Sequence, residues 1–226
     1  IHMDDYFYPY PAAGMPFPDD DSFRKYGLNK GYTSAQRGNW RRENVNTLIR
    51  ELKRTILLTK PWVRFGISPF GIYRNKKSTP DGSGSNTNGL QNYDDLYADV
   101  LHWVKEGWID YNMPQIYWEI GHPAADYITL IQWWNKNATP EGTHLYIGQD
   151  VARTMKADQL TRKMLYERSL SKVKGNCFWP ANEILWNNKG VADSLKRNYH
   201  RYPALIPAYS QMHNRAPKEV KKLKAE

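Results

Sequence analysis

Two kinds of hydrophobic pattern alternate along the chain. Short runs rich in β-branched and aromatic residues predict strands, and they lie at Ile1–Phe7, Val63–Ser68, Tyr111–Trp118, His144–Gly148 and Asn176–Trp179. Between these runs, apolar residues recur every three or four positions, a spacing typical of amphipathic helices. Such helices are predicted at Arg42–Leu58, Asp94–Glu106, Ala124–Asn137, Asp158–Lys174 and Gly190–Tyr199, with Gly107 and Gly175 ending the second and the fourth. Strands that alternate with helices are typical of an α/β fold with a parallel sheet.

The connecting segments differ in length according to the end of the strand from which they leave. Connections from a helix to the next strand are short, as at Thr59–Trp62 and Gly107–Asp110. Connections from a strand to the next helix are long, as at Tyr8–Arg41 and Pro69–Tyr93. Barrels of the (β/α) type place long loops at the carboxyl ends of their strands, where the active site lies. The polar, glycine-rich centre of the second long loop, Thr79–Ser85, is expected to be disordered.

Five βα units are fewer than the eight of a closed TIM barrel. Ile1–Phe7 begins in the manner of a strand interior, so we expect that an N-terminal portion of the barrel is missing from this sequence. No internal repeat is evident. We therefore predict one domain over residues 1–207, the C-terminal part of a (β/α) barrel, followed by a basic polar tail or linker over 208–226.

Aromatic residues are unusually frequent. Nine Trp and sixteen Tyr bring the aromatic fraction to 14%, although Leu and Ile can fill a core without them. Flat rings suit the apolar faces of sugars, so several of these side chains are candidates for sugar binding, and core packing is the alternative. The net charge of +9 is scattered, except for Lys218, Lys221, Lys222 and Lys224 in the tail. It therefore does not outline a nucleic-acid site, and it is compatible with an anionic polymer as substrate.

Other classes of site leave no signal in the sequence. Cys177 is the only cysteine, so no internal disulfide can form. No apolar run approaches the roughly 20 residues needed to cross a bilayer. The six histidines and Asp19–Asp21 lack the spacing of metal ligands, and no glycine-rich phosphate loop is present. We predict no metal, no cofactor and no membrane span, and the oligomeric state stays open.

Carboxylates gather where the predicted strands end. Asp4 and Asp5 end the first strand, Glu119 ends the third, and Asp150 and Glu183 follow the fourth and fifth. Hydrolysis of a glycosidic bond generally uses two carboxyl groups, one as acid and the other as nucleophile or base. Because neighbouring strand residues point to opposite faces, only one of Asp4 and Asp5 is expected to enter the barrel mouth.

Asp4, Asp5 and Glu119 are the predicted catalytic residues. Glu119 follows two aromatic residues, where partial desolvation favours the protonated form that a general acid needs. The alternatives are a loop cap or an ion pair for the aspartates, and a solvent-exposed loop residue for Glu119. Asp150 and Glu183 are predicted to be structural or peripheral.

Substrate-binding residues are predicted from aromatic and hydrogen-bonding side chains near the same edge. Arg74 and Asn75 follow the second strand and suit hydrogen bonds to sugar hydroxyls or to a negative substituent. The full predicted set is Tyr6, Tyr8, Trp40, Arg74, Asn75, Tyr117, Trp118, Gln149 and Trp179.

Several segments also carry a recognisable pattern, at Ile1–Pro9, Trp40–Val45, Ser68–Asn75, Tyr93–Asp99, Gly107–Tyr111 with Pro114–Trp118, and His144–Gln149. In this order, over about Ile1–Pro207, the sequence resembles a bacterial glycosyl-hydrolase-like family related to family 10. The resemblance implies an eight-stranded TIM barrel, of which this chain is about strands 4 to 8. It also implies a bacterial cell-envelope protein, often a lipoprotein.

The resemblance further implies an activity, the cleavage of peptidoglycan glycan strands, particularly strands stripped of their stem peptides. Asp4 and Asp5 match the family's most prominent acidic motif. The second carboxylate is left open between Glu119 and strands outside this sequence, and in the latter case this chain alone would not catalyse. Two alternatives remain, a carbohydrate-binding protein without turnover and a glycosidase that acts on another polysaccharide.

Overall fold

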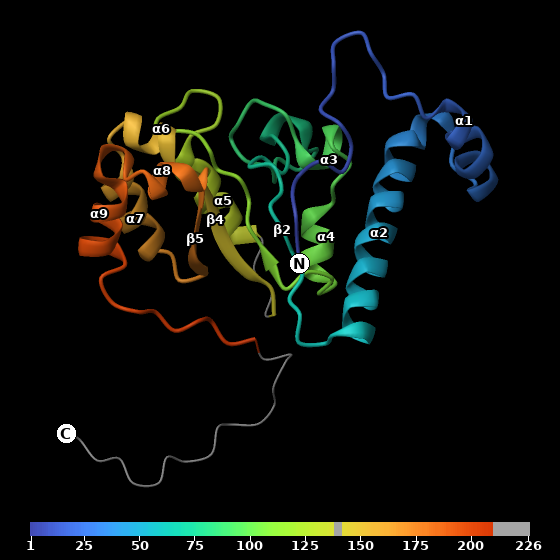
Figure 1. Ribbon diagram of the computed structural model, residues 1–226. Helices are drawn as coiled ribbons and strands as arrows, with labels where there is room; N and C mark the ends of the chain where they lie inside the picture. The colour runs from blue at the N-terminus through green and yellow to red at the C-terminus, as the bar shows by residue number, and fades with distance from the viewer. Residues whose placement is uncertain (138–141, 210–226) are drawn as a thin grey trace.

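The computed structural model describes residues 1–137 and 142–209. Five parallel strands form one sheet in the order β1-β2-β3-β4-β5, with bounds His2–Met3, Gly66–Ile67, Tyr111–Asn112, His144–Asp150 and Val173–Trp179. Neighbouring strands are consecutive in the chain, so each connection is a crossover (Figure 1). The predicted α/β fold class is confirmed. Among the described residues, β1 and β5 each pair with one strand, so the sheet is open and not closed into a barrel.

Helices of very different lengths surround the sheet (Figure 1). The longest is α2, at Arg37–Thr59. The others are α1 Asp20–Ser22, α3 Asn92–Asp95, α4 Val100–Lys105, α5 Tyr127–Asn137, α6 Val151–Lys156, α7 Leu160–Arg168, α8 Ala181–Leu185 and α9 Val191–Ser194, which a π-helical turn continues to Tyr199. No helix in the described ranges is both long and apolar enough to cross a bilayer.

The main hydrophobic core lies between the sheet and helices α2, α4 and α5. Ile49, Trp103 and Trp134 of these helices are fully buried in one cluster with Phe65 and Ile67 at β2. Alternate strand residues enter this core because successive side chains of a strand point to opposite faces. A smaller core joins the C-terminal helices, and it contains Val151, Leu160, Met164, Val191 and Leu195.

The other face of the sheet carries polar and aromatic side chains. His2 stacks on Tyr111 with 5.9 Å between the ring centroids, and Tyr111 meets Tyr146 edge-on at 6.0 Å. A Cβ atom at Gly66 would come within 2.2 Å of the Tyr111 ring, so glycine is needed where that ring covers β2. In a closed (β/α) barrel this face lines the interior.

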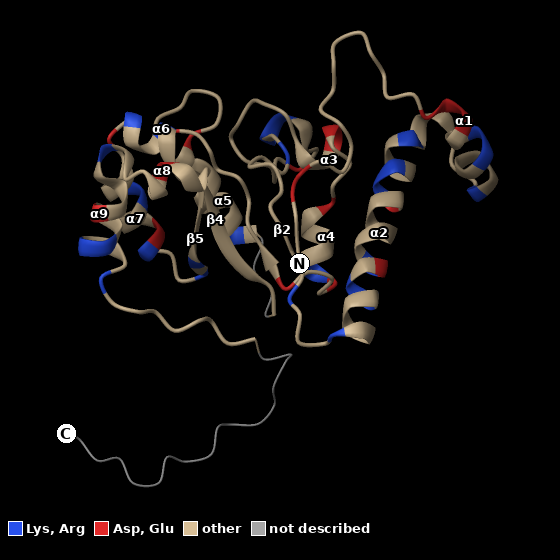
Figure 2. Ribbon diagram, in the orientation of Figure 1, with Lys and Arg blue, Asp and Glu red and all other residues tan. Residues whose placement is uncertain are grey.

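A buried ion pair ties α2 to the start of the strands. Lys53 Nζ lies 2.6 Å from Asp110 Oδ1, and the second oxygen of Asp110 accepts a hydrogen bond from the Phe65 N–H at 2.7 Å. Removing one partner of such a pair would leave an uncompensated buried charge. Most other Lys and Arg residues of the described chain lie on helices at both ends of the molecule, and they are not gathered in one place (Figure 2).

The predicted helix over Asp94–Glu106 is wrong in one respect, because the structure divides it into α3 and α4. Tyr97 adopts a left-handed conformation with φ 54°, which interrupts the helix. Asp99 then begins α4, and its side chain accepts a hydrogen bond from the His102 N–H. Gly107 follows the C-cap residue Glu106 of α4 with φ 66°, the left-handed conformation that its predicted place at a helix end requires.

The helix predicted to be capped by Asp158 and to run to about Lys174 has a different cap, Gln159, and ends earlier. Asp158 has φ 53° and lies outside the helix, which begins at Leu160. It ends at Arg168, because the chain from Val173 onward already forms β5, and Gly175 therefore lies inside a strand rather than at a helix end. The short helices α6 and α8 were not predicted.

The loop at Thr79–Ser85 is folded, so the expectation of a disordered centre is wrong. Ser85 is buried, and its backbone exchanges hydrogen bonds with Arg74 at 2.9 Å and with Lys76 at 2.7 Å. These bonds close the loop on the segment that follows β2. Of the predicted basic tail, residues 210–226 lie outside the described residues.

Candidate active site

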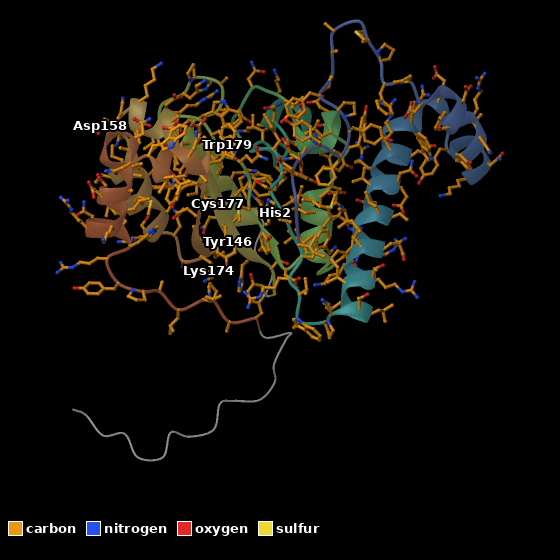
Figure 3. All side chains as sticks on the ribbon, in the orientation of Figure 1. His2, Tyr146, Asp158, Lys174, Cys177 and Trp179 are labelled. Carbon is orange, nitrogen blue, oxygen red and sulfur yellow. The ribbon has the colours of Figure 1, made fainter. Side chains whose placement is uncertain are left out.

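The carboxyl ends of the five parallel strands share one edge of the sheet. Figure 3 marks the direction of β5, with Lys174 near its beginning, Cys177 in its middle and Trp179 at its end. Asp4 follows β1 directly, and Gln115 follows β3 by three residues. The two side chains meet at this edge, where the loop lengths predicted an active site.

Asp4 presents an exposed carboxylate with one oxygen held in place. Its Oδ1 atom accepts hydrogen bonds from Gln115 Nε2 at 2.6 Å and from the backbone N–H of Asp5 at 2.9 Å. Gln115 Nε2 also donates to the carbonyl oxygen of Ser68 at 2.9 Å. Asp4 therefore has a defined orientation and remains open to a ligand.

Asp5 follows Asp4 beyond the end of β1, and its carboxyl group lies close to that of Asp4, so strand alternation does not separate the two side chains. It is only 1% exposed, and its Oδ2 atom accepts a hydrogen bond from Tyr10 Oη at 2.5 Å. Burial raises the pKa of Asp5, the hydrogen bond from Tyr10 opposes this rise, and the neighbouring charge of Asp4 adds to it. Since Asp5 is buried, Asp4 is the carboxylate of the two that a substrate can reach, and Asp5 fixes the loop after β1.

Two aromatic pairs lie at this same edge of the sheet. Tyr117 and Trp179 stack with ring centroids 5.6 Å apart and planes at 14°, and Trp179 is 54% exposed. Tyr6 stacks on Tyr10 at 5.4 Å, and both are exposed. Flat exposed rings at the edge that also carries a carboxylate suit a sugar-binding site.

A row of aromatic contacts continues from the second pair along the edge. Tyr10 meets Phe70 edge-on at 6.0 Å, and Phe70 meets Trp118 edge-on at 5.5 Å. Tyr8 points elsewhere, since it packs edge-on against Phe17 and Tyr97. Of the predicted aromatic residues of this edge, the row includes Tyr6 and Trp118, while Tyr8 holds the long loop after β1.

Four predicted substrate-binding residues are instead occupied by contacts within the protein. Trp40 is buried and packs edge-on against Phe23. Arg74 forms a two-pronged ion pair with Asp94, at 2.8 and 3.0 Å. The structure does not bring these two side chains to Asp4.

The same holds for the two predicted amides. Asn75 is buried, donates to the carbonyl oxygen of Gly89 at 2.8 Å, and accepts a hydrogen bond from the Thr87 hydroxyl at 2.9 Å. Gln149 is 0% exposed, and its Nε2 atom donates to Glu167 Oε1 at 2.6 Å. Both amides hold the fold together.

Glu119 follows the third strand end and is half-buried. Its backbone carbonyl accepts hydrogen bonds from the N–H groups of His122 and Tyr127, at 3.2 and 3.4 Å, which shapes the turn into α5. Its carboxylate makes no hydrogen bond or ion pair to the described residues. The role of Glu119 as the second carboxylate therefore stays a prediction.

Sequence reasoning missed Gln115, Ser68 and Tyr10, which hold the two aspartates. Gln115 lies two residues before Tyr117, and side chains two apart in an extended segment point to the same face. This alternation could have identified Gln115 as a residue of the same site. Ser68 contributes only its carbonyl oxygen, and Tyr10 approaches Asp5 through a loop, so neither leaves a sequence signal. Within residues 1–137 and 142–209, no three His, Cys, Asp or Glu side chains form a group that could hold a metal ion.

Comparisons with known proteins identify the family of this chain. The profile of the glycosyl hydrolase-like 10 family matches residues 1–164. Glycosyl hydrolase YngK of Bacillus subtilis (strain 168) is 42% identical over 229 residues, which cover 98% of this chain and 44% of that protein. Glycosyl hydrolase DigH of Escherichia coli (strain K12) is 42% identical over 148 residues, which cover 66% of this chain and 32% of that protein. The chain thus spans less than half the length of these curated relatives, and it belongs to the glycosyl hydrolase-like 10 family.

Proposed function

We propose that this chain forms part of the active site of a glycoside hydrolase whose substrate is a bacterial polysaccharide, specifically the glycan strands of peptidoglycan. The observation that carries the proposal is the exposed carboxylate of Asp4 at the carboxyl edge of a parallel sheet, an edge that also carries the stacked pair of Tyr117 and Trp179. The net charge of +9 suits a polymer that bears carboxylates. The proposed place of action of the full-length protein is the bacterial cell envelope, where that polymer lies, with a lipid anchor.

Asp4 supplies the carboxylate that acts on the sugar, as nucleophile or as general base. Gln115 and the Asp5 N–H both occupy Oδ1, so Oδ2 is the oxygen that faces the substrate. Hydrolysis needs a second carboxyl group as acid, and Glu119 is our candidate within this chain. The acid protonates the leaving oxygen as its bond to the anomeric carbon breaks. The new bond at that carbon is formed either by Asp4 itself, with water later releasing the sugar, or by a water molecule that Asp4 deprotonates.

The test is the release of new reducing ends from peptide-free peptidoglycan strands by the full-length protein. Asp4→Asn keeps the shape of the side chain and removes its charge, so turnover should fall by about 10²–10⁴-fold. The matched control is Asp158→Asn, at an exposed position with φ 53° that asparagine also adopts readily. A folded Asp4→Asn protein that retains full activity would remove Asp4 from the mechanism.

Carbohydrate binding without turnover is a second candidate function. It is favoured by the stacked pair of Tyr117 and the exposed Trp179, together with a Glu119 carboxylate that makes no hydrogen bond to the described residues around Asp4. Binding of the same glycan strands without new reducing ends would support it. Turnover of other polysaccharides, but not of peptidoglycan, would instead change the proposed substrate.

A further inference from the structure

The Gln115 side chain joins the segments that follow the first three strands. Its amide nitrogen lies 2.6 Å from Asp4 Oδ1, after β1, and 2.9 Å from the Ser68 carbonyl oxygen, after β2. A glutamine amide has two N–H donors, and both of these partners are acceptors. The two contacts therefore fix which end of the amide faces Asp4.

The backbone of Gln115 is itself held from both sides. Its N–H donates to the carbonyl oxygen of Pro69 at 2.9 Å, and it forms parallel bridges with Phe70 and with Gly148. A Cβ atom at Gly71 would come within 2.4 Å of the Gln115 carbonyl oxygen, and one at Gly148 within 3.2 Å of the Gln115 Cα atom. Two glycines therefore permit the neighbouring segments to close on this residue.

The consequence for Asp4 is an asymmetric carboxylate. Gln115 and the Asp5 N–H both donate to Oδ1, at 2.6 and 2.9 Å, whereas no N–H group of the described residues donates to Oδ2. A side chain that rotated freely would present either oxygen to a substrate. Groups held in one geometry before the substrate arrives lower the barrier of the chemical step.

We propose that Gln115 is a positioning residue for the hydrolytic reaction, which fixes Asp4 so that its Oδ2 atom faces the sugar. The inference rests on the proposed function of Asp4. Gln115 is not among the residues that the sequence predicted for the site, and its substitution has an effect on turnover that can be measured separately from that of Asp4. Because Gln115 acts through Asp4, its loss lowers kcat and leaves the binding of the glycan largely intact.

The first test is Gln115→Met in the full-length protein, with kcat and KM measured on peptide-free glycan strands. Methionine has a similar length but cannot donate, so kcat should fall by about 10²-fold, while KM changes by less than about threefold. The matched control is Gln132→Met, since Gln132 also donates through its amide, to Tyr166 Oη at 2.5 Å, on the exposed surface of α5. A folded Gln115→Met protein with wild-type kcat would overturn the proposal.

The second test separates positioning from a merely structural role. Gln115→Glu places an acceptor against Asp4 Oδ1, and the new carboxyl group can donate only when it holds a proton. The pH profile of kcat should therefore move toward acid, relative to wild type. A profile that is lowered equally at every pH, or left unchanged, would contradict the proposal, even if Gln115→Met failed to fold.

These outcomes remain distinct from a failure of the proposed function. If Asp4→Asn retains turnover, or the wild-type protein has none, the assignment of Asp4 is at fault. If Asp4→Asn abolishes turnover while both Gln115 variants behave as wild type, only the positioning role is lost.

Discussion

Two glutamines near strand ends donate to a carboxyl group at the same distance, in opposite surroundings. Gln115 Nε2 lies 2.6 Å from Oδ1 of the exposed Asp4, and Gln149 Nε2 lies 2.6 Å from Oε1 of the buried Glu167. Glu167 also accepts a hydrogen bond from Tyr127 Oη. The glutamine-to-carboxyl distance is the same in both clusters, so what distinguishes Asp4 from Glu167 is the burial of the carboxyl group.

Burial changes what the second carboxyl group can do. It raises the pKa of Glu167 to about 8, although Tyr127, Gln149 and the charge of Lys163 oppose the rise. Burial also lowers the pKa of Lys163 to about 8. A carboxyl group that holds its proton inside the fold serves packing, whereas an exposed one such as Asp4 can meet a substrate. A glutamine and carboxyl contact therefore indicates a site only together with access to solvent.

The largest effect expected from this comparison is on stability. Glu167→Leu leaves Tyr127 Oη and Gln149 Nε2 without their acceptor in the core, and should lower the free energy of unfolding by about 2–4 kcal/mol. Asp4→Leu, at the exposed cluster, should change it by less than about 1 kcal/mol. Urea denaturation of both variants measures the difference. Equal losses would show that burial does not distinguish the two clusters.

The second prediction concerns how the free energy of unfolding depends on pH because of Glu167. A carboxyl group whose pKa is higher in the folded state binds its proton more tightly there. Glu167 should therefore stabilise the fold below about pH 4.5, and this contribution should be lost as the pH rises toward about 8. Glu167→Gln should flatten the decline in unfolding free energy between these values. Glu106→Gln, at an exposed glutamate, is the control, and an unaltered slope in Glu167→Gln would refute the assignment.

The smallest effect concerns ligand affinity at the exposed cluster. Trp179→Ala removes one ring of the stacked pair, so the affinity of the full-length protein for glycan strands should fall about twofold to tenfold. Trp62→Ala is the control, because Trp62 is similarly exposed but precedes β2 at the opposite edge of the sheet. Titration calorimetry of both variants provides the measurement. A larger loss for Trp62→Ala would move the sugar site away from Trp179.

The sequence predicted the order and type of the main elements because their apolar residues follow the strand and helix periods. It failed where a single backbone conformation interrupts such a period, as at Tyr97 and Asp158, whose positive φ angles leave no hydrophobic signal. The hydrogen-bonded part of β1 is also shorter than its apolar run, at two residues.

The site was predicted in part, for a similar reason. Asp4 was identified from its place at a strand end, and burial, rather than strand alternation, distinguishes it from Asp5. Gln149 was assigned to the substrate from its position at a strand end alone. It shares alternate positions of β4 with the buried Leu145 and Ile147, so its side chain points to the same face, toward the helices. Gln115 was overlooked because the contact that defines it spans 111 residues of sequence.

The open sheet has a consequence for the behaviour of the chain in solution. A strand with a neighbour on one side only presents unpaired N–H and C=O groups, which are templates for another chain. β5 has seven residues and β1 two, so the edge at β5 is the longer template. Lys174, exposed near the beginning of β5, places a positive charge on this edge (Figure 3). Self-association of the isolated chain should therefore proceed through β5.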